Sequence, residues 1–195
     1  MRLIVVRHGR TQANAQGRFP TSAAVPLDEV GREQVARSGR RIADSGFRPA
    51  AIHSSDAERA LQTAAILRDL IDPALPVVPD PALRELDWGE LRGRAIGTGP
   101  ADDTGYARWQ RDPMSRLPGG ESLADVSARV TRVLDRIAAD GGPALLVSHA
   151  VTLTVLTARA LGWDLLDTWR SHRAHLSTGQ FRLLEPCPDP HPRAH

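Results

Sequence analysis

Two short apolar stretches of this chain each end close to a histidine, and an arginine precedes the first histidine. Residues 3–6 lead into Arg7 and His8, and residues 144–147 lead, after one serine, to His149. A short apolar run of this kind predicts a buried strand. Because the carboxyl ends of parallel strands meet at one edge of a sheet, we expect the two histidines to lie close together. A neutral histidine can act as a nucleophile, and an adjacent arginine can bind an anion.

Two further groups with complementary chemistry follow the next two predicted strands. Arg59 lies in the first turns of the helix after residues 50–53, and Glu85 lies in the loop after residues 76–78. Both are therefore expected at the same edge as the histidines. Arginine binds phosphate oxygens through two parallel hydrogen bonds, and a carboxylic acid can protonate a leaving oxygen. Together these residue types are suited to binding and transferring a phosphoryl group.

The elements that position these residues alternate between strands and helices. This alternation predicts an α/β fold, in which helices flank a mainly parallel sheet in a single three-layer domain. We expect the domain to cover residues 1–184, and a Pro-rich tail without regular structure to cover residues 185–195. Strands are expected at residues 2–6, 50–53, 76–78, 144–147 and 179–184, and helices at 28–45, 57–70, 106–109, 122–140 and 151–161.

Polar residues mark the expected starts of three helices. Asp28 is predicted as an N-cap, and Ser122 is predicted to form a capping box with Asp125 in place of the usual glutamate. The run at residues 54–56 is expected to cap the helix that carries Arg59. Ser55 and Ser122 are therefore interpreted as helix caps rather than as ligands.

Composition excludes several classes of function. The chain has 195 residues with 25 Lys+Arg against 23 Asp+Glu, which gives no support for binding nucleic acid. Its single cysteine, Cys187, excludes an internal disulfide, and no spacing of Cys with His indicates a zinc site. No apolar run is long enough to span a membrane, and the opening strand has no charged-then-apolar leader. A cytoplasmic protein without a membrane partner is expected.

The motifs of the chain, taken in order, resemble those of the histidine phosphatase superfamily, the phosphoglycerate-mutase-like group. The resemblance extends from residue 1 to about residue 154 and depends on the combination rather than on any one motif. The motifs that carry it are Arg7-His8-Gly9 with Thr11 and Asn14, Gly17-Arg18-Phe19, Pro26-Leu27 with Gly31 and Gln34, Ser54-Ser55-Asp56, Arg59-Ala60, Gln62-Thr63-Ala64, Leu83-Arg84-Glu85 with Gly89 and Gly93, Pro118-Gly119-Gly120-Glu121-Ser122 and Val147-Ser148-His149.

The resemblance implies a role for each matching residue. His8 is implied as the nucleophile that receives the phosphoryl group, and Glu85 as the proton donor to the leaving alkoxide. The phosphate oxygens are implied to contact Arg7, Asn14, Arg59 and His149. Neither a metal ion nor a cofactor is implied, since arginines supply the positive charge.

Several alternatives stay open for individual residues. Asp87 and Glu90 are rivals of Glu85 for the proton donor. Asn14 could instead hold the turn near Gly17. His53, His172 and His175 have no assigned role, and a solvated or hydrogen-bonded histidine is the default interpretation of each.

Two departures from the family pattern concern arginines. The family usually has an acidic or amide residue after the His-Gly pair, where this chain has Arg10, and often an aromatic-Glu-Gly triplet near the acid, where this chain has Leu91-Arg92-Gly93. If Arg10 and Arg92 face the site, they favour a substrate with a second anionic group. If they face solvent, they carry no functional meaning.

The sequence favours a phosphatase acting on a small phosphorylated substrate. Mutases of this group carry a longer insertion after the acid with a paired-arginine segment, whereas only residues 86–117 separate Glu85 from Pro118 here, and no two arginines are adjacent in them. A short lid protects a phosphorylated intermediate from water poorly. The alternatives are a phosphoglycerate-mutase-type phosphotransferase and a catalytically silent phosphate-binding or regulatory protein. A homodimer is compatible with the sequence.

Overall fold

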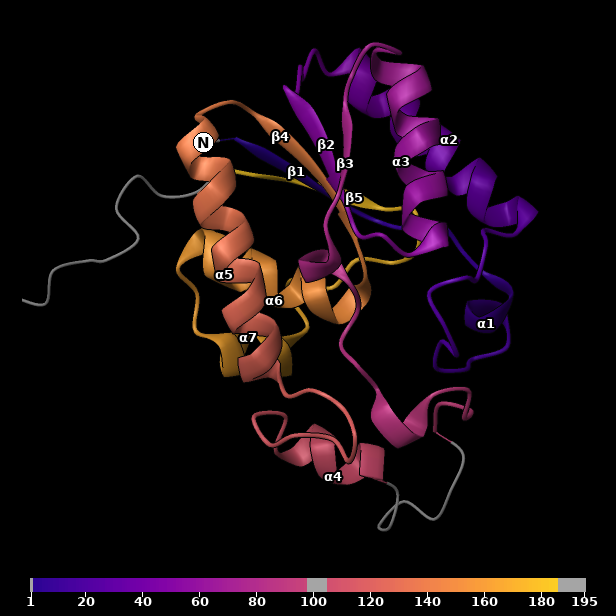
Figure 1. Cartoon of the computed structure of the whole chain (residues 1–195), viewed down its shortest axis with the longest axis vertical. Coiled ribbons are helices and arrows are strands. Elements are labelled where there is room, and N and C mark those ends of the chain that lie inside the picture. The colour runs from indigo at the N-terminus through magenta and orange to yellow at the C-terminus, as the bar shows by residue number, and fades with distance from the viewer. Residues whose placement is uncertain (1, 98–104, 186–195) are drawn as a thin grey trace, which may run out of the picture.

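The sheet of the computed structural model, which describes residues 2–97 and 105–185, runs through the centre of the molecule (Figure 1). Among these residues, five strands pair in the order β3-β2-β4-β1-β5. The pairs β3–β2, β2–β4 and β4–β1 are parallel, and β5 is antiparallel to β1. The predicted, mainly parallel sheet is therefore confirmed. The strands are β1 (Leu3–Arg7), β2 (Ala51–Ser54), β3 (Val77–Pro79), β4 (Ala144–Ser148) and β5 (Phe181–Leu184).

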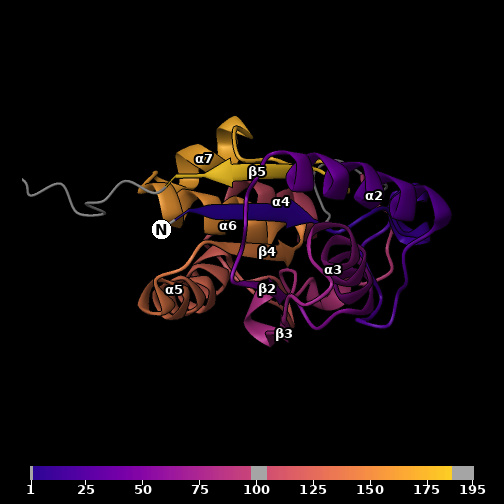
Figure 2. The ribbon, with the colours of Figure 1, turned by 90° about the horizontal axis from the view of Figure 1, so that it is seen from above.

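Helices cover both faces of this sheet, so the predicted three-layer arrangement is also confirmed (Figure 2). Side chains alternate along β1: Leu3 and Val5 pack in the core cluster that includes α5 and α6, while Ile4 and Val6 pack in the cluster that includes α2 and α3. The helices are α1 (Gln12–Ala15), α2 (Glu29–Asp44), α3 (Glu58–Ile71), α4 (Gly105–Arg111), α5 (Leu123–Asp140), α6 (Ala150–Leu161) and α7 (Leu165–Ser171), with 3-10 turns η1 (Pro81–Leu83) and η2 (Gly89–Leu91).

The predicted helix caps are confirmed at two positions and wrong at the third. Asp28 accepts a hydrogen bond from the backbone N–H of Gly31, and Ser122 forms the capping box with Asp125. The N-cap of α3 is Ala57, which makes no side-chain cap. Ser55 lies too far before the helix to cap it, and its hydroxyl has other partners.

Two helices were not predicted, because their sequence signals are short. α1 has four residues and is held by a capping box between Thr11 and Asn14. α7 has seven residues and follows α6 after a turn at Gly162. The predicted short helix near Tyr106 is confirmed as α4, whereas most of the predicted Pro-rich tail lies outside the described residues.

Every helix in the described ranges is too short or too polar to cross a lipid bilayer.

The loop after β1 and the start of α2 approach each other so closely that both contain glycine. A Cβ atom on Gly31 would collide with the carbonyl oxygen of Arg10 and would lie 2.6 Å from the Arg10 nitrogen. A Cβ atom on Gly9 would in turn collide with the carbonyl oxygen of Gly31. Because these contacts are with backbone atoms, neither collision can be relieved by a side-chain rotation.

We therefore expect Gly31→Ala to lower the free energy of unfolding by about 2 kcal/mol, as overpacking of a tight contact does. Urea unfolding followed by circular dichroism measures this change. Gly105→Ala is the matched control, because a Cβ atom at Gly105 would meet nothing within 4 Å. A Gly31→Ala protein as stable as the control would contradict the tight approach.

Candidate active site

His8 follows β1 directly and has a fixed hydrogen-bonding arrangement. Its ring Nδ1 lies 2.7 Å from the carbonyl oxygen of Gly9. A carbonyl oxygen only accepts hydrogen bonds, so a neutral His8 carries its proton on Nδ1. The Nε2 atom consequently keeps its lone pair. The Gly9 backbone is itself anchored, since its N–H donates to Thr63 Oγ1 at 3.2 Å.

The surroundings of His8 keep its imidazole neutral. Burial lowers the pKa of His8 from 6.5 to about 3, and the positive charges of Arg59 and Arg7 add to this shift, while the hydrogen bond to Gly9 opposes it. A protonated imidazole has no lone pair on Nε2 and cannot attack phosphorus. His8 is therefore neutral at neutral pH, the form in which an imidazole can act as a nucleophile.

This lowered pKa links stability to pH. Between about pH 6.5 and about pH 3 an unfolded His8 binds a proton that the folded His8 does not bind. The free energy of unfolding must therefore fall as pH drops below 6.5, by about 1.4 kcal/mol per pH unit for one such group. Urea unfolding at pH 7 and pH 5 should show a smaller loss for His8→Asn than for the wild-type protein. Equal losses in the two proteins would show that His8 is not held neutral.

His149 stands at the N-cap of α6, directly after β4, and its ring lies beside that of His8. The two ring centroids are 5.0 Å apart, so the meeting of the two histidines that the sequence predicts is confirmed. Nε2 of His149 lies 2.8 Å from Ser55 Oγ, whereas Nδ1 is buried and has no hydrogen-bond partner among the described residues. Burial, followed by the charge of Arg59, lowers the pKa of His149 well below 6.5.

Two arginines, the partly buried Arg7 and the buried Arg59, supply positive charge next to the histidines. Nη1 of Arg7 donates to the carbonyl oxygen of Leu176 at 2.8 Å, and its buried Nε has no partner in the described part of the chain. With the described residues, the Arg59 side chain makes one hydrogen bond, from Nη1 to the carbonyl oxygen of Ser22 at 3.3 Å. Burial lowers the pKa of both arginines and the charge of Glu85 opposes this, but a guanidinium stays protonated in proteins. Both arginines thus retain N–H donors for an anion.

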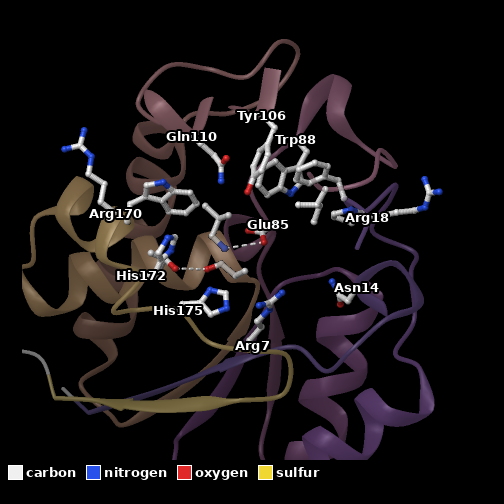
Figure 3. Close-up of a pocket in the computed structure, with 17 residues that line it drawn as sticks. Arg7, Asn14, Arg18, Glu85, Trp88, Tyr106, Gln110, Arg170, His172 and His175 are labelled. Carbon is white, nitrogen blue, oxygen red and sulfur yellow. Dashed lines mark hydrogen bonds between the residues drawn. The ribbon is translucent and has the colours of Figure 1, made fainter. Parts of the chain in front are cut away.

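Glu85 is held against the first turn of α6 by backbone donors. Its Oε1 accepts from the N–H of Leu86 at 2.9 Å and from the N–H of Thr152 at 3.2 Å, and its Oε2 accepts from the N–H of Val151 at 3.3 Å. Figure 3 shows the carboxyl group facing the same space as Arg7. Oε2, which accepts one long bond, is the oxygen better placed to exchange a proton with a substrate.

The two rivals of Glu85 have different surroundings. Asp87 pairs with Arg92 at 2.5 Å and also accepts from the N–H of Gly89. Glu90 is exposed. The geometry therefore favours Glu85 as the carboxyl group that faces a ligand.

The side chain of Asn14 is held by Thr11, and its phosphate contact stays a prediction. Its Oδ1 accepts from the backbone N–H of Thr11 at 3.1 Å, which stabilises the short helix α1. Since the amide oxygen is occupied, the Nδ2 group is the end left to donate to a ligand. Asn14 lines the same cavity as Arg7 (Figure 3).

A cavity of about 450 Å³ opens at these residues, and we call it the main cavity. Arg7, Asn14 and Glu85 lie along one side of it in Figure 3. A second cavity of about 310 Å³ is lined by Arg59 and also by Glu85. His8 and His149 are buried and line neither of these two cavities.

The structure does not bring Arg10 to the site, in contrast to the predicted substrate contact. Nε of Arg10 binds Asp28 Oδ2 at 2.8 Å, and Arg10 lines neither of the two cavities. Arg92 lines the second cavity, but its guanidinium is paired with Asp87. Both arginines that depart from the family pattern are thus paired with nearby carboxylates, and neither is a free cation for a second anionic group on the substrate.

Other residues that line the main cavity have no role that the sequence predicts. They come from α4, α7 and the turn after α7, which carry no catalytic motif and lie far from β1 in the sequence. Burial and the charge of Arg7 lower the pKa of His175, so this ring is a neutral polar group. The residues of this kind are Tyr106, Gln110, Trp169, Arg170, His172 and His175.

A comparison with known families gives one match along the chain. The sequence model of the Histidine phosphatase superfamily (branch 1) matches residues 3–186. Among curated proteins, Probable phosphoglycerate mutase GpmB of Salmonella paratyphi B is 33% identical over 183 residues, which cover 90% of this chain and 80% of that protein.

A second relative is longer than this chain. Bifunctional protein Rv2228c of Mycobacterium tuberculosis is 35% identical over 189 residues, which cover 94% of this chain and 50% of that protein. The chain therefore spans about half the length of this relative. One solved structure with a similar fold is that of mycobacterial glucosyl-3-phosphoglycerate phosphatase Rv2419c in complex with VO3. It superposes on this chain with a TM-score of 0.82 at 28% sequence identity, and the match covers 94% of this chain and 90% of that one.

Proposed function

Since the chain belongs to the histidine phosphatase superfamily, we propose that it hydrolyses a small phosphate monoester through a phosphohistidine on His8. The observation that carries this proposal is the state of His8. Its neutral ring has a free Nε2 lone pair and stands beside the cations Arg7 and Arg59. The similarity to a structure named as a phosphatase supports the same reaction class.

In the first step, the Nε2 lone pair of His8 forms a bond to phosphorus, and the bond between phosphorus and the ester oxygen breaks. The electron pair of that bond stays on the alcohol oxygen. Glu85, as the general acid, gives its proton to this oxygen, and a neutral alcohol leaves. The enzyme then holds a phosphohistidine and an ionised Glu85.

In the second step, a water molecule attacks the phosphorus of the phosphohistidine. Glu85 accepts the proton of the water, the N–P bond breaks, and its electron pair returns to Nε2 of His8. Inorganic phosphate is released, and both residues are back in their initial states. The net reaction consumes one ester and one water and yields one alcohol and one phosphate.

The remaining site residues stabilise charge on the transferring group. The free donors of Arg7 and Arg59, the Nδ2 group of Asn14 and the unpartnered Nδ1 of His149 are proposed to bind the non-bridging oxygens. Negative charge spreads over these oxygens during transfer, so donors fixed in a buried site stabilise the transition state. Positive charge from arginine takes the place that a metal ion has in other phosphoryl-transfer sites, and we expect activity to be insensitive to chelators.

A phosphoglycerate mutase is the second candidate, favoured by the similarity to the probable mutase of Salmonella. A mutase must also bind the carboxylate of its substrate. Arg10 and Arg92, the cations that departed from the family pattern, are already paired with carboxylates. We therefore place hydrolysis first.

An assay with 3-phosphoglycerate separates the two activities. We expect slow release of inorganic phosphate, unchanged by a bisphosphate primer, because water reaches the phosphohistidine. Phosphate release and isomerisation to 2-phosphoglycerate are measured in the same samples. Fast isomerisation with little phosphate release would favour the mutase, and absence of any turnover, with an activated aryl phosphate also inert, would favour a silent binding protein.

A further inference from the structure

Four aromatic side chains line the main cavity beyond its proposed phosphate-binding side. Phe19, Trp88, Tyr106 and Trp169 all line it. Three of these rings pack on one another, since the centroid of Phe19 lies 4.5 Å from that of Trp88 and 5.1 Å from that of Tyr106. The ring of Trp169 is held by Trp109, with centroids 5.2 Å apart. These contacts fix the wall before any ligand binds.

Two uncharged polar side chains, Tyr106 and Gln110, lie on this wall. The hydroxyl of Tyr106 and the amide of Gln110 face the interior of the cavity in Figure 3, and the two side chains form a hydrogen bond. Apart from Arg7, the arginines that line the cavity within the described part of the chain are Arg18 and Arg170, and their guanidinium groups point away from it in Figure 3. A second anionic group on the substrate would find no inward-facing cation on this wall.

The size of the main cavity also indicates a substrate larger than a three-carbon sugar acid. Pockets that bury drug-sized ligands have volumes of roughly 300–1,000 Å³. At about 450 Å³ the main cavity belongs to this class, whereas a three-carbon sugar acid would leave much of it filled with water. Planar groups bury large areas against aromatic side chains at preferred offset and edge-to-face geometries.

We propose that the substrate is a phosphate monoester whose alcohol carries a planar ring with hydrogen-bonding edges. Its phosphate would lie at Arg7, its ring against Tyr106 and Trp169, and its polar edge at Gln110. This inference rests on the proposed phosphatase function, because it assigns the alcohol part of the same substrate. It does not depend on which residue protonates the leaving group.

A pair of substrates with the same leaving group tests the inference. Ribose 5-phosphate and adenosine 5′-monophosphate both release the primary alcohol at the sugar C5, so a difference in kcat/KM reports the ring and not the chemistry. We expect a kcat/KM about 10-fold or more higher for the nucleotide, the size of effect that stacking of one base on an aromatic side chain gives. Trp169→Ala should reduce this preference.

Trp163→Ala is the matched control variant. Trp163 also lies near α7, but it packs against the guanidinium of Arg173 and does not line the main cavity, so the preference should persist. Equal values for the two substrates, a preference for ribose 5-phosphate, or turnover of p-nitrophenyl phosphate with neither substrate accepted would overturn the inference and leave the phosphatase proposal standing. Inactivity on all three compounds would overturn the proposed function itself.

A second inference comes from an independent observation, the buried pair of Ser55 and His149. Both residues have no exposed surface, and Ser55 Oγ lies 2.8 Å from Nε2 of His149. The same oxygen accepts a hydrogen bond from the N–H of Ala57 at 3.3 Å. A hydroxyl carries one proton to donate, and the nearby ring nitrogen can accept it.

We infer that Ser55 is a positioning residue that selects the tautomer of His149. When the hydroxyl donates to Nε2, the proton of the neutral ring must be on Nδ1. This is the atom that is buried without a partner, and an N–H there would be a donor for a phosphate oxygen. The other tautomer would direct a lone pair at the anion instead, which is repulsive.

Nitrogen-15 chemical shifts of the histidine rings distinguish the two tautomers. In the wild-type protein we expect His149 protonated on Nδ1, and in Ser55→Ala we expect Nε2 protonation to increase and kcat to fall about 10-fold. His8 is the internal control, because its tautomer is set by Gly9 and should not change. A wild-type His149 protonated on Nε2, or an unchanged tautomer in Ser55→Ala, would refute the assignment even if kcat fell.

Discussion

His8→Ala is expected to lower kcat for p-nitrophenyl phosphate by about 10⁴-fold or more, the loss that follows removal of a covalent nucleophile. The ring of His8 is neutral, keeps a lone pair on Nε2 and stands beside the cations Arg7 and Arg59. Steady-state kinetics measures the loss. A rapid alkaline quench of the wild-type enzyme with substrate, followed by mass spectrometry, should find phosphate on His8.

His53→Ala is the matched control for this prediction. His53 lies on β2, half-buried, and lines neither cavity, so its loss should leave kcat unchanged. Both variants must show wild-type circular dichroism. If His8→Ala retained about a tenth or more of the wild-type rate while folded, the covalent mechanism would be wrong, because so small an effect is far below the contribution of a nucleophile.

Glu85→Gln is expected to have an effect that depends on the leaving group. For an alkyl phosphate such as ribose 5-phosphate, kcat should fall by about 10³-fold, because a poor alkoxide leaving group needs a proton as it departs. For p-nitrophenyl phosphate the fall in the first step should be slight, since the phenolate leaves without a proton. Glutamine can still accept the N–H bonds of Leu86 and Thr152 through its amide oxygen, so the fold around α6 should be kept.

The controls for this experiment are the two carboxylates that the sequence could not exclude. Asp87→Asn and Glu90→Gln should not reproduce the difference between alkyl and aryl substrates, because Asp87 is paired with Arg92 and Glu90 is exposed. Pre-steady-state release of the phenol isolates the first step from hydrolysis of the phosphohistidine. An equal loss on both substrates in that step would mean that Glu85 positions the site rather than donating a proton.

The position of His8 can be predicted from the sequence, but its protonation state cannot. The sequence places a histidine after a buried strand, and this suffices to predict that it is held at the edge of the sheet. Its tautomer depends on a backbone carbonyl of the next residue, and its lowered pKa on burial and on Arg59, fifty-one positions later in the chain. Solvent exclusion by distant segments is a property of the folded protein, and no local pattern contains it.

The pairing of these charged side chains could not be predicted from the sequence either. Arg10 and Arg92 each had two interpretations, toward the ligand or toward solvent, and the structure shows a third, in which each is paired with a carboxylate. The partner of Arg10 is Asp28, the residue that also caps α2. The cap could be predicted because it acts within one turn of a helix, whereas the ion pair needs β1 and α2 to be packed together.

By itself, the sequence determined the alternation of strands and helices, the mainly parallel sheet, and the presence of His8, His149, Arg59 and Glu85 at one edge of it. These features follow from periodicity and from the rule that parallel strands end together, and both act over short stretches of chain. The tertiary structure alone decided which residues line the main cavity and what Ser55 contacts. Tyr106, Gln110 and Trp169 line this cavity although α4 and α7 lie far from β1 in the chain. Such contacts join segments that are distant in the chain, so their free energy is realised only when the whole domain has folded.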